Sequence, residues 1–512
     1  MGFLNLILIT AKYTVLLLVP YILVLGSYRV LLHPLRSYPG PPLARLSNAY
    51  GGFYAWNRCL YLKTWRDHLK YGPVIRQGPD KLVFNSLTAV HDIYLNENVS
   101  KSTCYQAGNV NPKTTNVLTT IDKKVHRIKR KLVGTVVSER SMKTFEPTML
   151  EQISIFIKQL LLLSRENSPI NMSDRCKYLG LDIAGYLGFG YSLNLQTDEE
   201  NRFLFPLMKF GSWRLNLYMQ FPAIRKFRYD LYLYIRVLIR GKGYLNTLTK
   251  MIKARLSQDP HAHHDLYSVM MDSLNSDDPE KVALNEIWTE AISFMPAAGD
   301  TTSTTLSSLF FYLAQNPDCK RKLVEEIQST FTSGEDIRAG AKLSGCIYLR
   351  ACIDEALRMS PPVAGTLWRE QLPQDGDTPW IVDGHVIPRG TQVGVNIYSL
   401  HHNEEYFPDP FTYKPERWLG DQGKSANRAA FMPFSTGARG CAGKAMAYQE
   451  TSLVMTKTLW YFDFEPASHN GNGCAEVNEN GEFLLYEILT SYHDGPYLMF
   501  KTRGDLWKEI DQ

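Results

Sequence analysis

The segment FMPFSTGARGCAG, residues 431–443, decides how the rest of this 512-residue chain is interpreted. Its three glycines remove side-chain bulk around one sulfur, that of Cys441, and permit a tight turn. Backbone N–H groups in such a turn, the nearby Arg439 and a helical pattern starting near Ala442 would all favour a thiolate. Phe434 would shield that thiolate from water. A soft, shielded thiolate suits an iron ligand; the alternative is a buried cysteine in a glycine-rich turn.

Three further motifs precede this loop. Glu355 and Arg358 stand three residues apart on one face of a helical segment, a spacing that a solvated ion pair would also give. The sequence PERW follows at 415–418, and AAGDT lies upstream at 297–301. Along the chain, AAGDT comes first, the Glu355–Arg358 pair second and PERW third, all before FxxGxRxCxG. This series of motifs resembles the cytochrome P450 family. The resemblance covers roughly residues 28–505 and is nearest to fungal microsomal members.

The resemblance implies a haem b cofactor with the Cys441 thiolate as axial ligand. A buried network of Glu355, Arg358 and Arg417 would fix the cysteine side of the haem, a structural role. His126 stands where the family has tryptophan, which weakens its assignment but not that of the arginine four residues later. The expected cofactor-binding residues are Arg130, His126, Arg369, Arg439, Phe434, Gly437 and Gly443.

The segment from Phe294 to Thr305 is an unusual helix, because it contains a proline, a glycine and four threonines. One interpretation makes Asp300 or Thr302 an N-cap that restarts the helix. The resemblance implies instead that the helix opens beside the iron and that Asp300 and Thr301 relay protons to iron-bound oxygen. The family's usual glycine is Ala298 here, which would shift or narrow the groove. The expected pocket-lining residues are Val363, Ala364, Gly365, Thr366, Leu367, Ala297 and Ala298.

Composition agrees with a large folded enzyme. Hydrophobic residues make up 44% and charged residues 21%, and a net charge of +5 gives no argument for nucleic-acid binding. The eight cysteines form neither a disulfide framework nor a zinc site. Helical patterns dominate between residues 115 and 360, and 378–396 looks like a hairpin around Asp383-Gly384. We expect a mainly α protein with small β-sheets (α+β), the cytochrome P450 fold, as a single haem-enclosing domain behind a transmembrane helix.

The amino terminus predicts a membrane anchor. Residues 3–28 are almost entirely apolar, with Lys12 as the only charge, and about 20 such residues span a bilayer. Arginines follow, which would place the body in the cytosol, at the endoplasmic reticulum. A cleaved signal peptide or a buried core helix are the alternatives. The expected organisation is an anchor at 1–28, a basic, proline-rich linker at 29–49 and a catalytic domain at 50–512.

Two segments suggest contacts outside the active site. The run 121–132 holds six basic residues, which would be a solvated helix face or a docking surface for an acidic reductase. Residues 203–234 hold ten aromatic residues interleaved with cations such as Lys209 and Arg214. They would either pack in the core or roof the pocket and dip into the membrane surface.

We therefore expect a membrane-anchored haem-thiolate monooxygenase. It would oxidise a small apolar substrate with O2 and with electrons from NADPH delivered by an NADPH–cytochrome reductase, and a polyketide, terpenoid or alkaloid skeleton would suit the fungal resemblance. One alternative is an isomerase or dehydratase of the same fold, against which the Asp300–Thr301 pair argues. Another is a haem electron carrier that has no substrate of its own.

Overall fold

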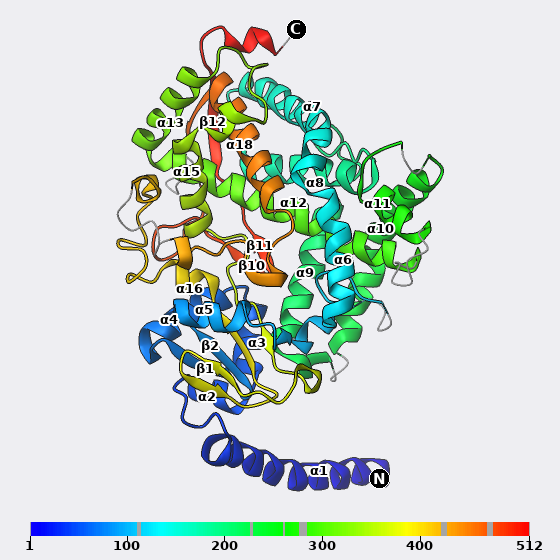
Figure 1. The fold of residues 1–512 in the computed structure, drawn as a ribbon. Helices are drawn as coiled ribbons and strands as arrows, with labels where there is room; N and C mark the ends of the chain where they lie inside the picture. Colours follow the sequence, from blue (N-terminus) through cyan, green and yellow to red (C-terminus); the bar gives the residue numbers. More distant parts are fainter. Residues whose placement is uncertain are drawn as a thin grey trace.

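A computed structural model describes residues 2–109, 114–225, 229–259, 262–275, 284–420, 428–467 and 475–510. The protein is mainly helical with small sheets, as expected (Figure 1). The helices are α1 Gly2–Ser27, α2 Pro42–Leu46, α3 Ala49–Trp56, α4 Leu60–Tyr71, α5 Leu87–Tyr94, α6 Lys123–Val136, α7 Glu139–Ser164, α8 Met172–Phe189, α9 Leu204–Gln220, α10 Tyr229–Leu256, α11 Leu266–Asn275, α12 Leu284–Gln315, α13 Pro317–Thr330, α14 Ala341–Ser344, α15 Ile347–Met359, α16 Ile397–His401 and α18 Lys444–Tyr461.

The strands form a five-stranded sheet and three smaller ones. The large sheet has the order β1-β2-β8-β5-β3, in which only β2 and β8 run parallel. The small sheets are β4-β12-β9, β6-β7 and β10-β11. The strands are β1 Val74–Gly78, β2 Lys81–Phe84, β3 Ser100–Lys101, β4 Ile170–Asn171, β5 Arg369–Glu370, β6 Trp380–Val382, β7 His385–Ile387, β8 Gln392–Val395, β9 Phe462–Pro466, β10 Tyr486–Ile488, β11 Thr490–Tyr492 and β12 Tyr497–Thr502.

The β6–β7 pair confirms the predicted hairpin. Its two-residue turn is Asp383-Gly384, and both residues have positive φ, 48° and 75°. A right-twisted hairpin needs this turn geometry, and Asp-Gly adopts it readily.

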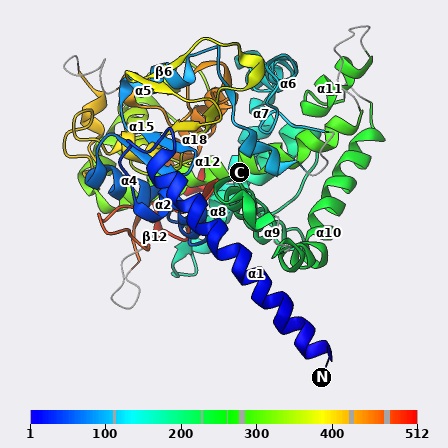
Figure 2. The ribbon, with the colours of Figure 1, turned by 90° about the horizontal axis from the view of Figure 1, so that it is seen from below.

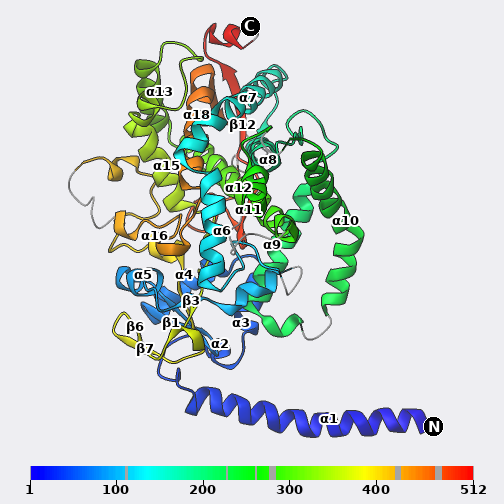
Figure 3. The same cartoon turned by 45° about the vertical axis from the view of Figure 1, so that its right-hand side comes forward.

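Helix α12 runs through the middle of the molecule and packs most extensively against α8 (Figure 3). It is continuous from Leu284 to Gln315, so neither Asp300 nor Thr302 is an N-cap. Two glycines allow the close approach of the two helices. A Cβ added to Gly299 would lie 2.5 Å from Cδ2 of Leu181, and one added to Gly180 would lie 2.9 Å from the carbonyl oxygen of Gly299. Gly299 is therefore a packing residue that faces α8.

Helix α1 extends away from the body of the molecule (Figures 1 and 2). Its described apolar side chains are solvent-exposed, among them Leu17, Leu23 and Val24. Within the part of the chain that the structure describes, no helix combines the length and apolar character that crossing a membrane requires. The predicted transmembrane span over residues 1–28 is therefore not supported.

Gly180→Ala should lower the stability of the folded protein. The new methyl group would meet a backbone oxygen of α12 and force the helices apart, which costs about 1–3 kcal/mol. Gly134→Ala in α6 is the matched control. Nothing lies within 4 Å of its added Cβ, so we expect a gain of up to about 1 kcal/mol. The apparent thermal midpoints should move in opposite directions, and equal midpoints would contradict the packing role.

Candidate active site

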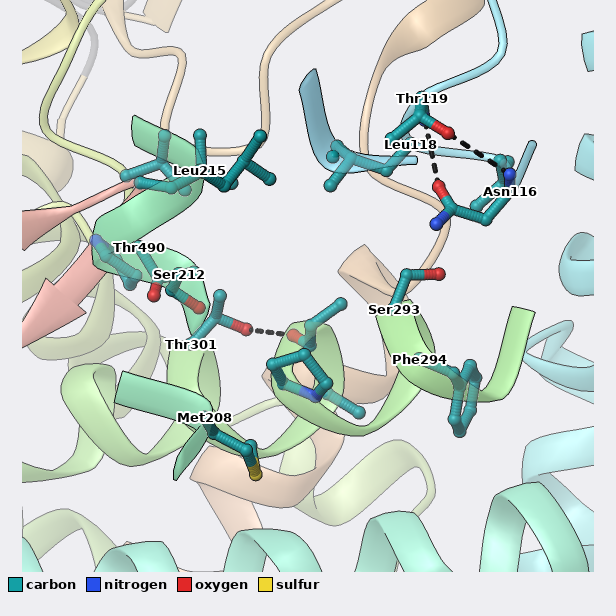
Figure 4. A pocket seen from close by; sticks show the side chains of 18 of the residues that line it. Asn116, Leu118, Thr119, Met208, Ser212, Leu215, Ser293, Phe294, Thr301 and Thr490 are labelled. Carbon is teal, nitrogen blue, oxygen red and sulfur yellow. Dashed lines mark hydrogen bonds between the residues drawn. The ribbon is translucent and has the colours of Figure 1, made fainter. Parts of the chain in front are cut away.

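A cavity of about 1690 Å³ lies between α9, α12 and the cysteine-bearing loop. Its described lining is mostly apolar and comes from distant segments of the chain. Figure 4 shows side chains from α9, from α12 and from the segments before and after them around this space. Those labelled include Leu118, Met208, Ser212, Leu215, Phe294, Thr301 and Thr490. The wall also contains Cys441, so one cavity joins the two residues that the sequence assigned to iron ligation and proton transfer.

The cysteine loop is a folded turn rather than an irregular segment. The N–H of Cys441 donates to the carbonyl oxygen of Phe434 at 2.8 Å, which closes the turn. Gly437 has φ +71°, and a Cβ there would lie 2.1 Å from the carbonyl oxygen of Tyr94, so the position requires glycine. The Phe434 ring packs on Tyr448 with ring centroids 5.2 Å apart. Gly443 directly precedes α18.

The environment of Cys441 differs in two ways from the sequence expectation. Burial raises the pKa of the Cys441 thiol, and the Gly443 N–H, Arg130 and Lys444 only partly oppose this. The side chain is accessible because it faces the cavity, while protein surrounds it elsewhere. Arg439, expected to favour the thiolate, instead donates to the carbonyl oxygens of Thr120 and Ile121 at 2.7 and 2.8 Å. A thiolate here would therefore form together with metal binding, which displaces the proton.

Several cations gather at one side of the cavity, and Asp122 is the acid that acts on the pKa of one of them, Arg439. Arg130, Arg369 and Arg439 line it, and none forms an ion pair with a carboxylate in the described parts of the chain. Burial lowers the pKa of Arg439 to about 10, and Arg369 adds to this effect. Burial also lowers the pKa of His126 to about 3, helped by Arg439, so His126 is neutral at pH 7.

Sequence reasoning missed one member of this group, Lys101. Its position in β3 lies directly opposite Arg369 in β5, an arrangement of like charges that destabilises a sheet unless an anion is near. Burial lowers the pKa of Lys101 well below its ordinary value, and Arg369 and Arg439 add to this. No sequence motif marks Lys101. It reaches the site because β3 pairs with β5, which lies 268 residues later in the chain.

The predicted Glu355–Arg358–Arg417 network is present and fully buried at its centre. Arg358 donates to both carboxylate oxygens of Glu355 at 2.9 and 3.0 Å, and Arg417 donates to one at 2.9 Å. Trp418 Nε1 donates to the other at 3.0 Å. Burial alone would raise the pKa of Glu355, but the two guanidinium groups hold it below its ordinary value.

This network reaches the cysteine loop through one histidine. Arg358 donates to the carbonyl oxygen of His401 at 3.0 Å, and Nδ1 of His401 lies 3.1 Å from the carbonyl oxygen of Arg358. Nε2 of His401 accepts the N–H of Met432 at 3.0 Å. Met432 begins the segment that ends at Cys441, so the buried carboxylate fixes where that loop starts.

The two residues assigned to proton transfer lie on different sides of α12. Thr301 lines the cavity, and its hydroxyl donates to the carbonyl oxygen of Ala297 at 2.7 Å. Asp300 is not among the described lining residues. Burial raises the pKa of its carboxyl to about 7, and Lys177 of α8 acts in the opposite direction. The carboxyl thus faces α8, although its main-chain neighbour faces the cavity.

The predicted pocket residues divide in the same way. Ala297, Ala298, Val363 and Leu367 line the cavity. Ala364 is fully buried in the core, Gly365 lies against Glu487, and Thr366 forms a β-bridge with Asn396. Ala364 and Thr366 do not line the cavity, because side chains of an extended segment alternate in direction, and Gly365 has no side chain.

A comparison with known proteins now adds to this geometry. A family model described as Cytochrome P450 matches residues 54–485. The chain belongs to the cytochrome P450 family. The chain is 34% identical to Cytochrome P450 monooxygenase poxM of Penicillium oxalicum, covering 94% of this chain and 93% of that protein. It is 32% identical to Cytochrome P450 monooxygenase AKT7 of Alternaria alternata, with 96% and 98% covered, and 31% identical to Cytochrome P450 monooxygenase atnE of Emericella nidulans, with 93% of each.

The prediction of a P450 monooxygenase, an oxidoreductase, is confirmed by these relatives. The family implies haem with cysteine thiolate ligation, and the residues present fit that group. The cavity offers a cysteine sulfur in its wall and, in the described lining, buried cations that lack an anionic partner. The two propionate carboxylates of a haem would supply the missing negative charge. Arg130, Arg369, Arg439, His126 and Lys101 would hold this P450's haem at that edge.

Glu355→Gln should destabilise this P450 by about 3–5 kcal/mol, because it leaves two buried guanidinium groups without their anion. The matched control is Glu325→Gln, whose exposed pair with Arg321 should contribute little. The apparent thermal midpoint measures both. The stabilising charge of Glu355 is present at pH 7 and is lost as pH falls through its lowered pKa, so the difference between wild type and Glu355→Gln should shrink in acid. A midpoint unchanged by Glu355→Gln would refute the role.

Proposed function

We propose that this P450 is a membrane-associated monooxygenase of fungal secondary metabolism that oxidises a small, largely apolar organic substrate. One atom of O2 enters the substrate and the other leaves as water, with two electrons from NADPH, passed on by a reductase, and two protons. The observation that carries the proposal is that Cys441, Thr301 and a large apolar wall border one cavity. Relatives named as monooxygenases of fungi support it.

Haem bound through Cys441 would supply dioxygen activation, and this chain's residues supply the surroundings. Ala297, Ala298, Val363 and Leu367 orient an apolar substrate and exclude water. Arg130, Arg369 and Arg439 neutralise the propionates. The Glu355 network holds the loop, since it fixes Met432 through His401.

We assign proton delivery to Thr301, which lines the cavity, and to Asp300, which lies near Lys177 of α8. A carboxyl with a pKa of about 7 both takes up and releases a proton near neutral pH. Lys177 of α8 lies near Asp300, and its Nζ donates to the carbonyl oxygen of His493 at 3.2 Å. The Asp300 carboxyl would exchange protons on the α8 side, and the Thr301 hydroxyl would donate within the cavity. No hydrogen bond joins these two side chains in the described structure.

Exposed side chains of α6 and α1 form the proposed contact surfaces for a reductase and for the membrane. Lys124, Arg127 and Lys131 of α6 are exposed and lie on one face, whereas Lys129 is buried against Glu290 at 3.1 Å. The exposed three form a docking site for an acidic reductase. The exposed apolar side chains of α1 attach the protein to the endoplasmic reticulum membrane, with the catalytic body in the cytosol.

Cys441→Ser should abolish the strongly red-shifted Soret band of the reduced, carbon monoxide-bound protein, because serine is a hard and weakly acidic ligand. Cys352→Ser is the control, since Cys352 is buried away from the cavity. It should keep the band in whatever protein folds. Monooxygenase turnover retained by Cys441→Ser would sink the proposed function.

Thr301→Ala should keep the haem spectrum but divert NADPH electrons to peroxide, because the proton donor in the cavity is lost. We expect coupling of NADPH to product to fall by about tenfold or more. Thr304→Ala is the matched control. Its hydroxyl makes the same kind of bond, to the carbonyl oxygen of Asp300 at 2.8 Å, but does not line the described cavity. Equal coupling in the two variants would exclude the proton-transfer role of Thr301.

A further inference from the structure

The charged residues that line the cavity are almost all basic. Glu290 is the one acidic side chain in the described lining. It is already neutralised, since Lys129 lies 3.1 Å from its carboxylate and the Val117 N–H donates to it at 3.1 Å. Of the cations, Lys101, Arg130, Arg369 and Arg439 belong to the haem edge. This leaves Arg58, Lys209 and Arg214, three cations that line the cavity outside the haem edge.

These three cations contact aromatic faces but no anion. Arg58 lies over the Trp213 ring at 6.0 Å, Arg214 over Tyr218 at 5.6 Å, and Lys209 over Tyr492. None of them forms an ion pair with a carboxylate in the residues described. Nε of Arg58 is moreover buried without a hydrogen-bond partner.

The backbone holds Arg58 in place at some cost. Arg58 follows α3 and has φ +61°, a conformation that side chains other than glycine rarely adopt. Its carbonyl oxygen accepts the Glu487 N–H at 2.8 Å, which ties it to β10. Backbone strain of this kind is typical of functional positions.

Arg58 lies over the Trp213 ring, and Trp213 is one turn of α9 away from Lys209, so the two cations are neighbours on the cavity wall. Burial, together with Arg58 and Lys177, lowers the pKa of Lys209 to about 8, while Asp494 acts in the opposite direction. The Asp494 carboxylate is engaged elsewhere, since it accepts from Asn171 at 2.8 Å. Lys209 still carries its proton at pH 7. Two adjacent cations on a cavity wall, half withdrawn from water, are arranged to receive an anion.

We propose that the substrate of this P450 carries a carboxylate, bound between Arg58 and Lys209, on an apolar body that extends toward Thr301. The inference rests on the proposed function and names its substrate class. The planar Arg58 fork matches the two oxygens of a carboxylate, and Lys209 adds a second cation. A phosphate would match the same fork, and the ligand comparison below distinguishes the two. Within the aromatic-rich segment 203–234, the α9 residues Lys209 and Arg214 line the cavity, as the alternative that this segment roofs the pocket expected.

The test compares ligands of equal length on the haem-loaded protein. Dodecanoate, dodecan-1-ol and dodecyl phosphate are titrated by calorimetry at pH 7 and low salt. We expect dodecanoate to bind about tenfold or more tightly than dodecan-1-ol. Equal affinities for acid and alcohol would overturn the proposal, and tighter binding of the phosphate would overturn the choice of a carboxylate.

Variants of Lys209 and Arg58 test whether these residues cause the preference for acid over alcohol. Lys209→Gln and Arg58→Gln should each remove most of the preference for acid over alcohol, and Lys209→Arg should keep it. Lys253→Gln, an exposed lysine of α10 outside the described lining, should change nothing. A preference that survives both glutamine variants would contradict the assignment to these residues.

The carbon monoxide spectrum of every sample separates this inference from the function. A normal thiolate band without any acid preference defeats the substrate class alone. Loss of the band in the wild type defeats the proposed function itself.

Discussion

The rest of this structure depends on a carboxylate, that of Glu355, held between two guanidinium groups in the core. A buried charge of this kind is tolerated only when every oxygen is occupied, and here Arg358, Arg417 and the Trp418 indole occupy both. The geometry passes through His401 to the start of the cysteine loop. The cysteine loop, which contains several turns, is thereby held in place by the buried ion pairs of Glu355.

A second constraint is the imbalance of charge inside the cavity. The described walls carry several unpaired cations and one neutralised acid. Such an arrangement is costly while it stands alone, and it becomes favourable when anions arrive. The cofactor's propionates and the proposed substrate carboxylate would therefore also stabilise the fold, since a ligand that binds only the native state adds to its stability.

The sequence was most informative where chemistry is local. The hairpin turn at Asp383-Gly384 and the Glu355–Arg358 pair both follow from residues a few positions apart. It was less informative where distant segments meet. Lys101 opposite Arg369 depends on strand pairing, and Arg58 beside Lys209 depends on tertiary packing. Asp300 and Thr301 were treated as one pair, although adjacent helical residues point about 100° apart.

That angular separation on α12 has a consequence for how such an enzyme can change. The face with Ala297, Ala298 and Thr301 lines the cavity, whereas Gly299 packs on α8 and Asp300 lies near Lys177 of α8. Residues on the first face and across the cavity can diversify to fit new carbon skeletons while the acid's neighbours stay constant. Evolution and protein engineering can therefore reshape the cavity wall without disturbing the packing of α12 against α8.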